Sequence, residues 1–146
     1  MVESQFLFAQ GGQPLKPANI VNTTAKIKTM FIYNFTNYIE WPVELRKGNF
    51  VIGVLGNTDL LNELVALAEK KQIKNQPLVI KTFSSAESVS GCHMIYVTPE
   101  KSDMITTIQN KLKGTNTLIL TDKEGMLKQG AAINFVLRNS KQEFEL

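Results

Sequence analysis

A strongly amphipathic stretch lies between Lys26 and Pro42. At 100° per residue, its large apolar side chains share one broad face and its polar side chains gather on the other. The apolar set is Ile27, Met30, Phe31, Ile32, Phe35, Tyr38 and Ile39, and the polar set is Thr29, Thr36, Asn37 and Glu40. Thr23 or Thr24 can cap such a helix, and Pro42 ends it because proline lacks an N–H. The pattern predicts a helix that packs on the domain through the apolar set.

Five short apolar runs follow, at residues 50–55, 78–83, 94–97, 117–121 and 132–137. Continuous runs of this length are typical of strands that are buried on both faces. Helical patterns between them cover residues 60–71 and 102–112. Alternating strands and helices favour right-handed crossovers and a mostly parallel sheet. We therefore expect a three-layer α/β domain with a five-stranded sheet and helices on both faces, and residues 143–146 can add an antiparallel hairpin to the last strand.

The beginning of the chain has a different composition. Residues 1–22 contain two adjacent glycines and two prolines and are expected to form an irregular arm, whereas residues 23–146 form the single domain. The apolar segment Phe6–Gln10 is either the remnant of a secretory leader or part of a loosely packed arm.

Six motifs occur in a fixed order along the domain. They are F-I-Y-N-F-T-N-Y-I-E-W-P, F-V-I-G-V-L-G, G-C-H-M-I-Y-V, T-L-I-L-T-D, G-A-A-I-N-F and the terminal F-E-L. Together they resemble the YfiR-like family of small bacterial periplasmic regulatory proteins, from about Ala25 to the C-terminus. No single motif is catalytic, so the resemblance depends on their order and spacing.

The resemblance implies a periplasmic, non-catalytic inhibitor that holds a membrane-anchored diguanylate cyclase inactive and so lowers cyclic-di-GMP output. A sensory domain that controls a membrane sensor kinase is the close variant. It also implies the three-layer fold and a homodimer. Relatives usually continue into another helix beyond the position of Leu146, and they often have paired cysteines where this chain has only Cys92.

The charge and the cysteine count limit the classes of partner and ligand that we expect. The net charge is +3, and the lysines are scattered without interleaved aromatic residues, so a nucleic-acid partner is not expected. One cysteine excludes an internal disulfide and a multi-cysteine metal site. We expect no cofactor and no metal, and a small anionic effector is a possible ligand.

Two places could bind an anion. Ligands of open α/β sheets bind outside the carboxyl ends of the strands, where Gly56 and Asn57 follow the first strand. The glycine lets the backbone approach a ligand and the next helix N-terminus favours an anion, although a plain strand-to-helix turn explains the same residues. Arg138, at the end of the fifth strand, could bind an anionic ligand or a partner carboxylate, or be solvated.

Catalytic chemistry has little support. The only histidine, His93, is adjacent to Cys92, and neighbours on an extended segment point to opposite faces, so they cannot form a nucleophile–base pair. His93 is either structural, donating to a backbone carbonyl, or functional. A small hydrolase acting on a phosphate or carboxylate ester remains the alternative, and an oligomer built from the first helix and a sheet edge is a third.

Three residues near the first helix are candidates for partner or ligand contacts. Tyr38 and Trp41 are of the types that dominate interfaces, and core packing competes for both. Asn34 falls inside the predicted apolar face, where it needs a hydrogen-bond partner or contacts a ligand.

Overall fold

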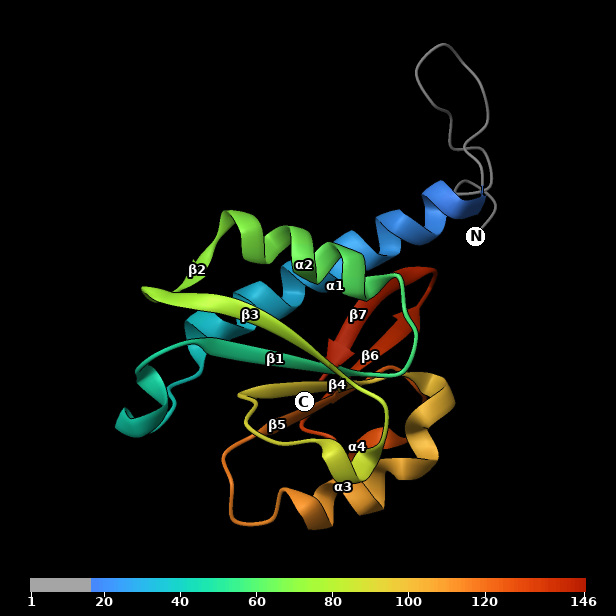
Figure 1. Cartoon of the computed structure of the whole chain (residues 1–146). Helices are drawn as coiled ribbons and strands as arrows, with labels where there is room; N and C mark the ends of the chain where they lie inside the picture. Colours follow the sequence, from blue (N-terminus) through green and yellow to red (C-terminus); the bar gives the residue numbers. More distant parts are fainter. Residues whose placement is uncertain (1–16) are drawn as a thin grey trace.

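The computed structural model describes residues 17–146, and the side chains from residue 23 onward. The elements are α1 (Pro17–Tyr38), η2 (Val43–Arg46), β1 (Phe50–Leu55), α2 (Leu60–Lys70), β2 (Gln72–Ile73), β3 (Gln76–Phe83), η3 (Ala86–Ser88), β4 (Met94–Val97), η4 (Pro99–Met104), α3 (Ile105–Lys111), β5 (Leu118–Thr121), α4 (Met126–Gln129), β6 (Ile133–Arg138) and β7 (Lys141–Glu145). Helices α1 and α2 cover one face of the sheet, and α3 and α4 lie on the other (Figure 1).

The sheet has seven strands in the order β2-β3-β1-β4-β5-β6-β7, not the predicted five. The five predicted strands are present as the parallel strands β3-β1-β4-β5-β6. Their order is that of a doubly wound sheet, whose direction of winding reverses between β1 and β4. The predicted C-terminal hairpin is confirmed, because β7 pairs antiparallel with β6.

The remaining strand, β2, was not predicted. It pairs antiparallel with the start of β3 through only two residue pairs, Gln72 with Pro77 and Ile73 with Gln76. The connecting residues Lys74 and Asn75 have φ values of 48° and 72°, as in the tight turns that match the twist of a hairpin. Because proline usually interrupts a strand, the sequence predicted a break at Gln76–Pro77 and no hairpin. Strand β3 tolerates Pro77 because only one neighbouring strand pairs with it at this position.

Helix α1 differs from its prediction in its ends and in its buried face. It begins at Pro17, earlier than the expected threonine cap, and ends at Tyr38, before Pro42. Residues 1–16 of the expected arm, including Phe6–Gln10, lie outside the described residues. The shorter C-terminal end leaves residues 39–42 as a segment without regular secondary structure between the helix and η2.

The buried face of α1 consists of Ala25, Thr29, Ile32, Phe35 and Thr36. The two threonines were assigned to the polar face, but their hydroxyls donate to the carbonyls of Ala25 and Tyr33, at 2.8 and 2.5 Å. A threonine that satisfies its own hydroxyl in this way can bury its methyl group. The helix is therefore rotated relative to the prediction, and several large apolar residues of the predicted face lie on its outer side.

Two apolar cores fill the spaces above and below the sheet. Phe31 and Phe35 of α1 pack against Phe135 and meet Phe144 edge-on, so that they cover the β6–β7 hairpin with ring centroids 4.6 to 6.4 Å apart. The opposite core joins α3 and η3 to the other face of the strands. Strand β1 is buried along its whole length, as predicted for a central strand.

Candidate functional site

An aromatic cluster lies at the amino end of the parallel sheet. The Trp41 ring meets Phe50 edge-on with centroids 5.0 Å apart, and Phe50 stacks on His93 at 4.2 Å. Trp41 comes from the segment after α1, Phe50 begins β1, and His93 precedes β4. The cluster therefore joins α1 to the starts of two central strands.

His93 is fully occupied by backbone groups. Its Nδ1 accepts the N–H of Val51 at 3.1 Å, and its Nε2 lies 2.7 Å from the carbonyl oxygen of Leu45. This pair of partners assigns the neutral tautomer with hydrogen on Nε2. His93 therefore ties the η2 segment to β1 and has no ring nitrogen free for a ligand.

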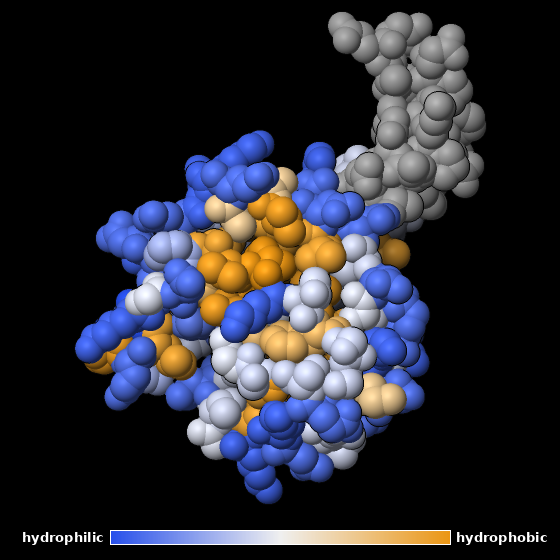
Figure 2. Space-filling model, in the orientation of Figure 1, coloured by the Kyte–Doolittle hydropathy of each residue, from blue (hydrophilic) through white to orange (hydrophobic). Residues whose placement is uncertain are grey.

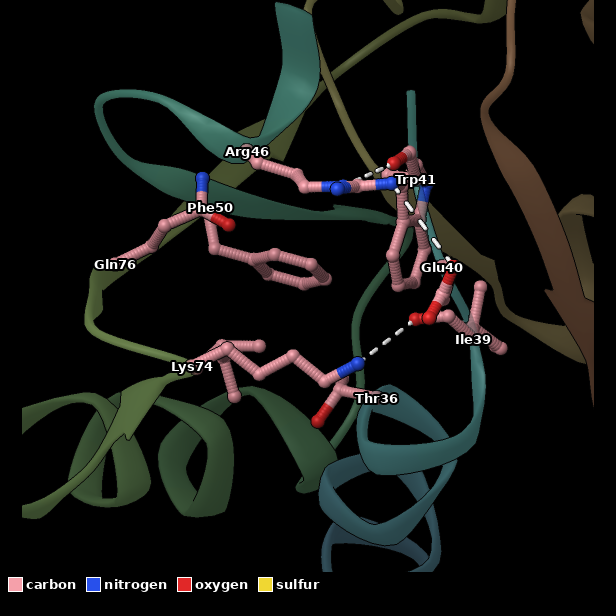
Figure 3. A pocket seen from close by; sticks show the side chains of 9 residues that line it. Thr36, Ile39, Glu40, Trp41, Arg46, Phe50, Lys74 and Gln76 are labelled. Atoms are coloured by element: carbon pink, nitrogen blue, oxygen red, sulfur yellow. Dashed lines mark hydrogen bonds and ion pairs between the residues drawn. The ribbon is translucent and has the colours of Figure 1, made fainter. Parts of the chain in front are cut away.

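A cavity of about 190 Å³ opens beside the cluster (Figure 3). Its apolar walls include Trp41, Phe50 and Ile73, and polar groups lie around them. Lys74 Nζ donates to the carbonyl of Ile39 at 3.2 Å, and Arg46 Nε donates to that of Trp41 at 2.6 Å. The two cations hold the chain where it leaves α1, and the wall of the cavity also carries Glu40, whose carboxylate lies 3.9 Å from Arg46.

A second cavity of about 400 Å³ lies on the other side of the same segment. Leu45, Cys92 and Leu112 are among its lining residues. Burial raises the pKa of the Cys92 thiol from 9.0 to about 11, and nearby Lys81 only partly offsets this. The thiol is therefore protonated at neutral pH and is a poor nucleophile.

At the carboxyl end of the sheet, the crevice between β1 and β4, where α/β proteins usually bind ligands, is filled, whereas a cavity of about 460 Å³ lies farther along between Asp122 and Arg138. Gly56 follows β1 with a φ of +108°, and a Cβ atom there would lie 2.0 Å from Thr98 Oγ1. Thr98 follows β4 and is completely buried, and its hydroxyl has no hydrogen-bond partner among the described residues. This close approach closes the sheet where the winding reverses, so the backbone of Gly56 faces a side chain and not an open site.

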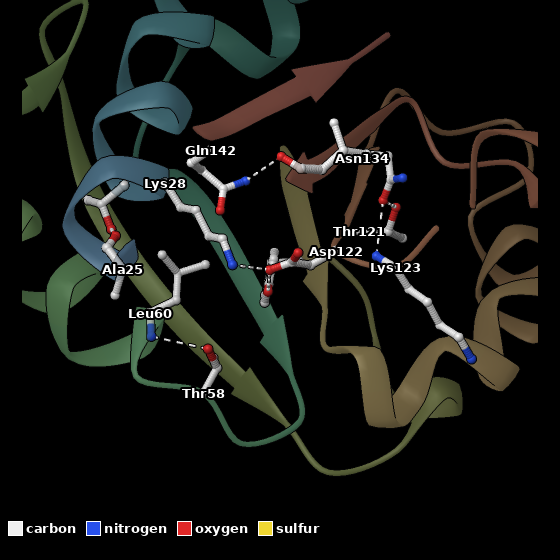
Figure 4. Close-up of polar contacts among 12 residues, drawn as sticks. Ala25, Lys28, Thr58, Leu60, Thr121, Asp122, Lys123, Asn134 and Gln142 are labelled. Atoms are coloured by element: carbon white, nitrogen blue, oxygen red, sulfur yellow. Dashed lines mark hydrogen bonds and ion pairs between the residues drawn. The ribbon is translucent and has the colours of Figure 1, made fainter. Parts of the chain in front are cut away.

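Polar side chains next to this contact bind one another. Lys28 of α1 forms an ion pair with Asp122, which follows β5 (Figure 4). Tyr96 donates to the same carboxylate at 2.9 Å. Burial, followed by the charge of Asp122, raises the pKa of the Tyr96 hydroxyl, which stays a neutral donor. This group fastens α1 to the strands across the carboxyl end.

Arg138 and Asn134 form a second polar group there. Arg138 lies 3.1 Å from Glu145 and 3.4 Å from Glu143, both on the paired strand β7. Buried Asn134 accepts from Thr121 and donates to Glu145. The Arg138 side chain is thus bound within the hairpin, although it is half exposed and accessible to an anion.

The structure separates the predicted site residues into three groups, of which the third, Asn34 and Tyr38, lies on α1. Gly56, Asn57 and Arg138 belong to the carboxyl end, whereas Trp41 and His93 are 5.7 Å apart at the amino end. Trp41 is buried, so its role in packing is clear. Sequence inspection missed the cavity residues Arg46 and Lys74, because nothing in their local pattern indicates that two distant turns converge beside Trp41.

Asn34 and Tyr38 lie on the outer face of α1. Tyr38 is 87% exposed, Met30 53% and Ile27 41%, and Asn34 is exposed between them. The spacing 27, 30, 34, 38 places these side chains in one row. Because Asn34 is in contact with solvent, it needs no internal partner, and the row is a mostly apolar surface that no described part of the chain covers.

No group of three or more potential metal ligands occurs among residues 17–146. In the same range, no helix has the length and apolarity needed to cross a membrane. The two cavities at the amino end, a third cavity of about 460 Å³ beside Arg138 and the outer row on α1 are features that can bind a ligand or a protein.

The YfiR/HmsC-like family model matches residues 25–146, which is most of the chain and all of the described sheet. The chain belongs to the YfiR/HmsC-like family. No curated protein matches the sequence. The YfiR/HmsC-like family is periplasmic and regulatory rather than catalytic, and it implies interaction with a membrane signalling protein. Family membership thus supports a regulatory role.

Proposed function

We propose that this protein is a non-catalytic periplasmic regulator that holds a membrane-anchored diguanylate cyclase inactive through the outer row of α1. The row consists of Ile27, Met30, Asn34 and Tyr38. Three apolar or aromatic side chains exposed at helical spacing are the observation that carries the proposal, because exposed apolar rows of this kind mark protein-binding surfaces. Family membership supports the class of partner. A homodimer is part of the proposal.

Regulation requires that a signal change the affinity of the protein for one state of its partner. The cavity beside Trp41 is a suitable place for a small anionic effector, since Lys74 and Arg46 outnumber Glu40 among the charged residues on its wall. Both cations also bind the carbonyls of residues that follow α1. An anion that competes for these cations would release the segment next to Tyr38 and alter the partner-binding row.

The test is capture of a membrane protein from bacterial envelope extract, with the full chain as bait. A Met30→Ala/Tyr38→Ala variant removes most of the exposed row, and Leu137→Ala, which changes a 71% exposed side chain at the far end of β6, is the control. We expect the wild-type and control chains to recover a protein with a cyclase output domain, and the double variant to recover at least tenfold less.

Two outcomes would contradict the proposal. Equal recovery by all three chains would place the interface away from α1. If the wild-type chain recovers no cyclase or kinase, the proposed class of partner is wrong. Turnover of phosphate or carboxylate esters by the same chain would then favour the hydrolase alternative. Circular dichroism of each variant must match the wild type for the comparison to hold.

A further inference from the structure

The exposed cations are unevenly distributed over the molecule. The described residues carry a net charge of +3, because Lys16 and Glu3, which lie outside them, cancel. Seven exposed cations lie at the amino end of the parallel sheet, and they are Arg46, Lys47, Lys70, Lys71, Lys74, Lys111 and Lys113. The acids near them are Glu40, Glu44, Glu69 and Glu87. These seven cations form a basic surface that accounts for the whole net charge, since the charges of the other described residues balance.

Three segments that are separate in the sequence form the basic surface. They are η2 with the residue after it, the end of α2 with the β2–β3 turn, and the end of α3 with the loop after it. Gln76 of β3 donates to the carbonyl of Leu45 in η2 at 3.0 Å, and Leu112, which follows α3, lines a cavity together with Leu45. All three segments lie on the left side of the molecule in Figure 1. Lysines that are scattered along the sequence thus gather on one side in the fold.

Helix ends explain only part of this surface. Lys70 and Lys111 lie in the last turns of α2 and α3, where a cation compensates the partial negative charge of the helix end. Arg46, Lys47 and Lys74 lie outside these helices, in short turns. The accumulation of positive charge therefore goes beyond what the helices need.

Most cations of the basic surface have no acidic partner. Arg46 lies 3.9 Å from Glu40, and Lys74 and Lys111 donate to backbone carbonyls. The other four form no ion pair with a described residue, and they are Lys47, Lys70, Lys71 and Lys113. At the carboxyl end, in contrast, Lys28 is paired with an acid inside the fold. The basic surface is therefore free to bind an external anion.

An apolar side chain projects among these cations. Val43 begins η2 and is 58% exposed. Figure 2 shows a small hydrophobic spot between hydrophilic residues at the left of the molecule, where η2 lies in Figure 1. Helix α1 ends at the same end of the sheet with Tyr38, which is 87% exposed. Exposed apolar and aromatic side chains flanked by lysine and arginine are typical of surfaces that bind the headgroup region of a bilayer.

We infer that the basic surface binds a bilayer that contains anionic phospholipids, with Val43 entering the headgroup layer. Lipid headgroups are mobile, so they can meet cations that are spread over three segments, whereas a protein segment would need acids at matching positions. The family is periplasmic, so a membrane is within reach. The inference goes beyond the proposed function and does not depend on the protein partner, although it would hold the chain beside a membrane-anchored one.

The binding should be weak and sensitive to salt. One lysine or arginine near an anionic bilayer strengthens binding about fivefold, and the glutamates of the same end offset part of this gain. The Debye length falls from about 10 Å at 0.1 M salt to about 3 Å at 1 M, which removes most of the attraction between exposed charges. We therefore expect reversible binding at low salt that is lost at high salt.

The test is flotation of the full chain with vesicles made of equal parts of phosphatidylglycerol and phosphatidylcholine. We expect flotation with these vesicles and none with phosphatidylcholine alone. Lys47→Glu/Lys71→Glu should lower the affinity for the anionic vesicles at least about tenfold. Val43→Ser, which leaves the charge unchanged, should lower it severalfold.

A matched control separates the basic surface from net charge. Lys128→Glu/Lys141→Glu makes the same change in net charge at two exposed positions, on α4 and at the start of β7, to the right of the basic surface in Figure 1. This variant should keep its affinity within about twofold of the wild type. Residues 1–16 are the same in all chains, so a difference between the variants reports on the basic surface. Circular dichroism of each variant must match the wild type.

Four results would overturn the inference. Absence of flotation with anionic vesicles at low salt would refute it, and the proposed row on α1 would stand because protein capture tests that row. Equal losses in the two double variants would mean that binding follows net charge. Release by inorganic phosphate at constant ionic strength would assign the cations to a free anion. Protein capture that is lost in Lys47→Glu/Lys71→Glu, without vesicle binding by the wild type, would assign the surface to an acidic protein segment.

Discussion

The two ends of the parallel sheet differ in how their polar groups and spaces are used. At the carboxyl end, Gly56 and Thr98 are in close contact, and Lys28, Asp122 and Tyr96 bind one another. At the amino end, two cavities flank the segment that runs from Trp41 to Leu45. The crevice at the carboxyl end where the winding reverses is thus closed, and the open spaces lie at the amino end and, away from the crevice, in a cavity of about 460 Å³ between Asp122 and Arg138.

The difference shows that fold alone is a poor guide to the site. The winding of the sheet reverses between β1 and β4, as the doubly wound pattern requires, but side chains of this sequence fill the crevice that the reversal creates. Their contacts fix α1 on the sheet, and α1 carries the exposed row. The closed end therefore contributes to stability, and the predictions below test this contrast.

The largest effect is expected for Gly56→Ala at the closed end. The new Cβ would lie 2.0 Å from Thr98 Oγ1, and the φ of +108° is unfavourable for alanine. Overpacking and backbone strain together should lower the free energy of unfolding by about 3 kcal/mol. Urea denaturation measures this loss.

The control Gly48→Ala separates the cost of backbone strain from the cost of the steric contact with Thr98. Gly48 also has a positive φ, +70°, but nothing lies within 4 Å of the position that an alanine methyl group would take there. It should cost about 1 kcal/mol. Thr98→Ala should recover part of the loss in the Gly56→Ala background. Equal costs for the two glycines would mean that the carboxyl end is not closed by this contact.

A smaller effect is expected for the ion pair between Lys28 and Asp122. Their side chains are only 15% and 18% exposed, so Asp122→Ala leaves a mostly buried ammonium group and a Tyr96 hydroxyl without their acceptor. We expect a loss of about 2 kcal/mol in the free energy of unfolding. Glu63→Ala breaks the more exposed pair with Lys26 and should cost less than about 1 kcal/mol. Similar losses for both variants would show that the closed end is no more tightly held than the surface.

The smallest effect on stability is expected for Cys92, which lines the second cavity at the amino end of the sheet. Since burial raises the pKa of its thiol from 9.0 to about 11, the thiolate fraction at pH 8 is about a hundredfold lower than for an exposed cysteine. A disulfide reagent should react about a hundredfold faster in urea than in the native state. The neutral thiol favours the fold below pH 9, and this contribution is lost as the pH rises towards 11. Equal rates in the two states would show that the second cavity admits solvent freely to Cys92.

The sequence predicted the regular elements of the central sheet well. The run from Phe50 to Leu55 was long, apolar and bounded by turns, and it forms the buried strand β1 with the predicted ends. The hairpin of β2 escaped notice because two paired residues are too few to produce a periodic pattern. The buried face of α1 was misassigned because two threonines, polar by type, satisfy their hydroxyls within the helix and pack as apolar groups.

The candidate site was predicted less well than the fold. Tyr38 was chosen as a core or interface residue, and only the orientation of α1 on the sheet shows that it is exposed. Arg46, Phe50 and Lys74 meet at one cavity although they come from three separate segments. Neither the closing contact of Gly56 with Thr98 nor the pairing of Lys28 with Asp122 leaves a local signal, because each joins residues more than 40 positions apart.

The sequence by itself determined the α/β class, the parallel strands and the membership of a regulatory family, because these depend on local periodicity and on the order of motifs. The tertiary structure decided where the crevice at the carboxyl end of the sheet is filled, which side of α1 faces outward and where the exposed cations gather. These properties depend on how distant side chains fill or leave the space between elements, and the one-dimensional pattern of apolar and polar residues does not contain that information.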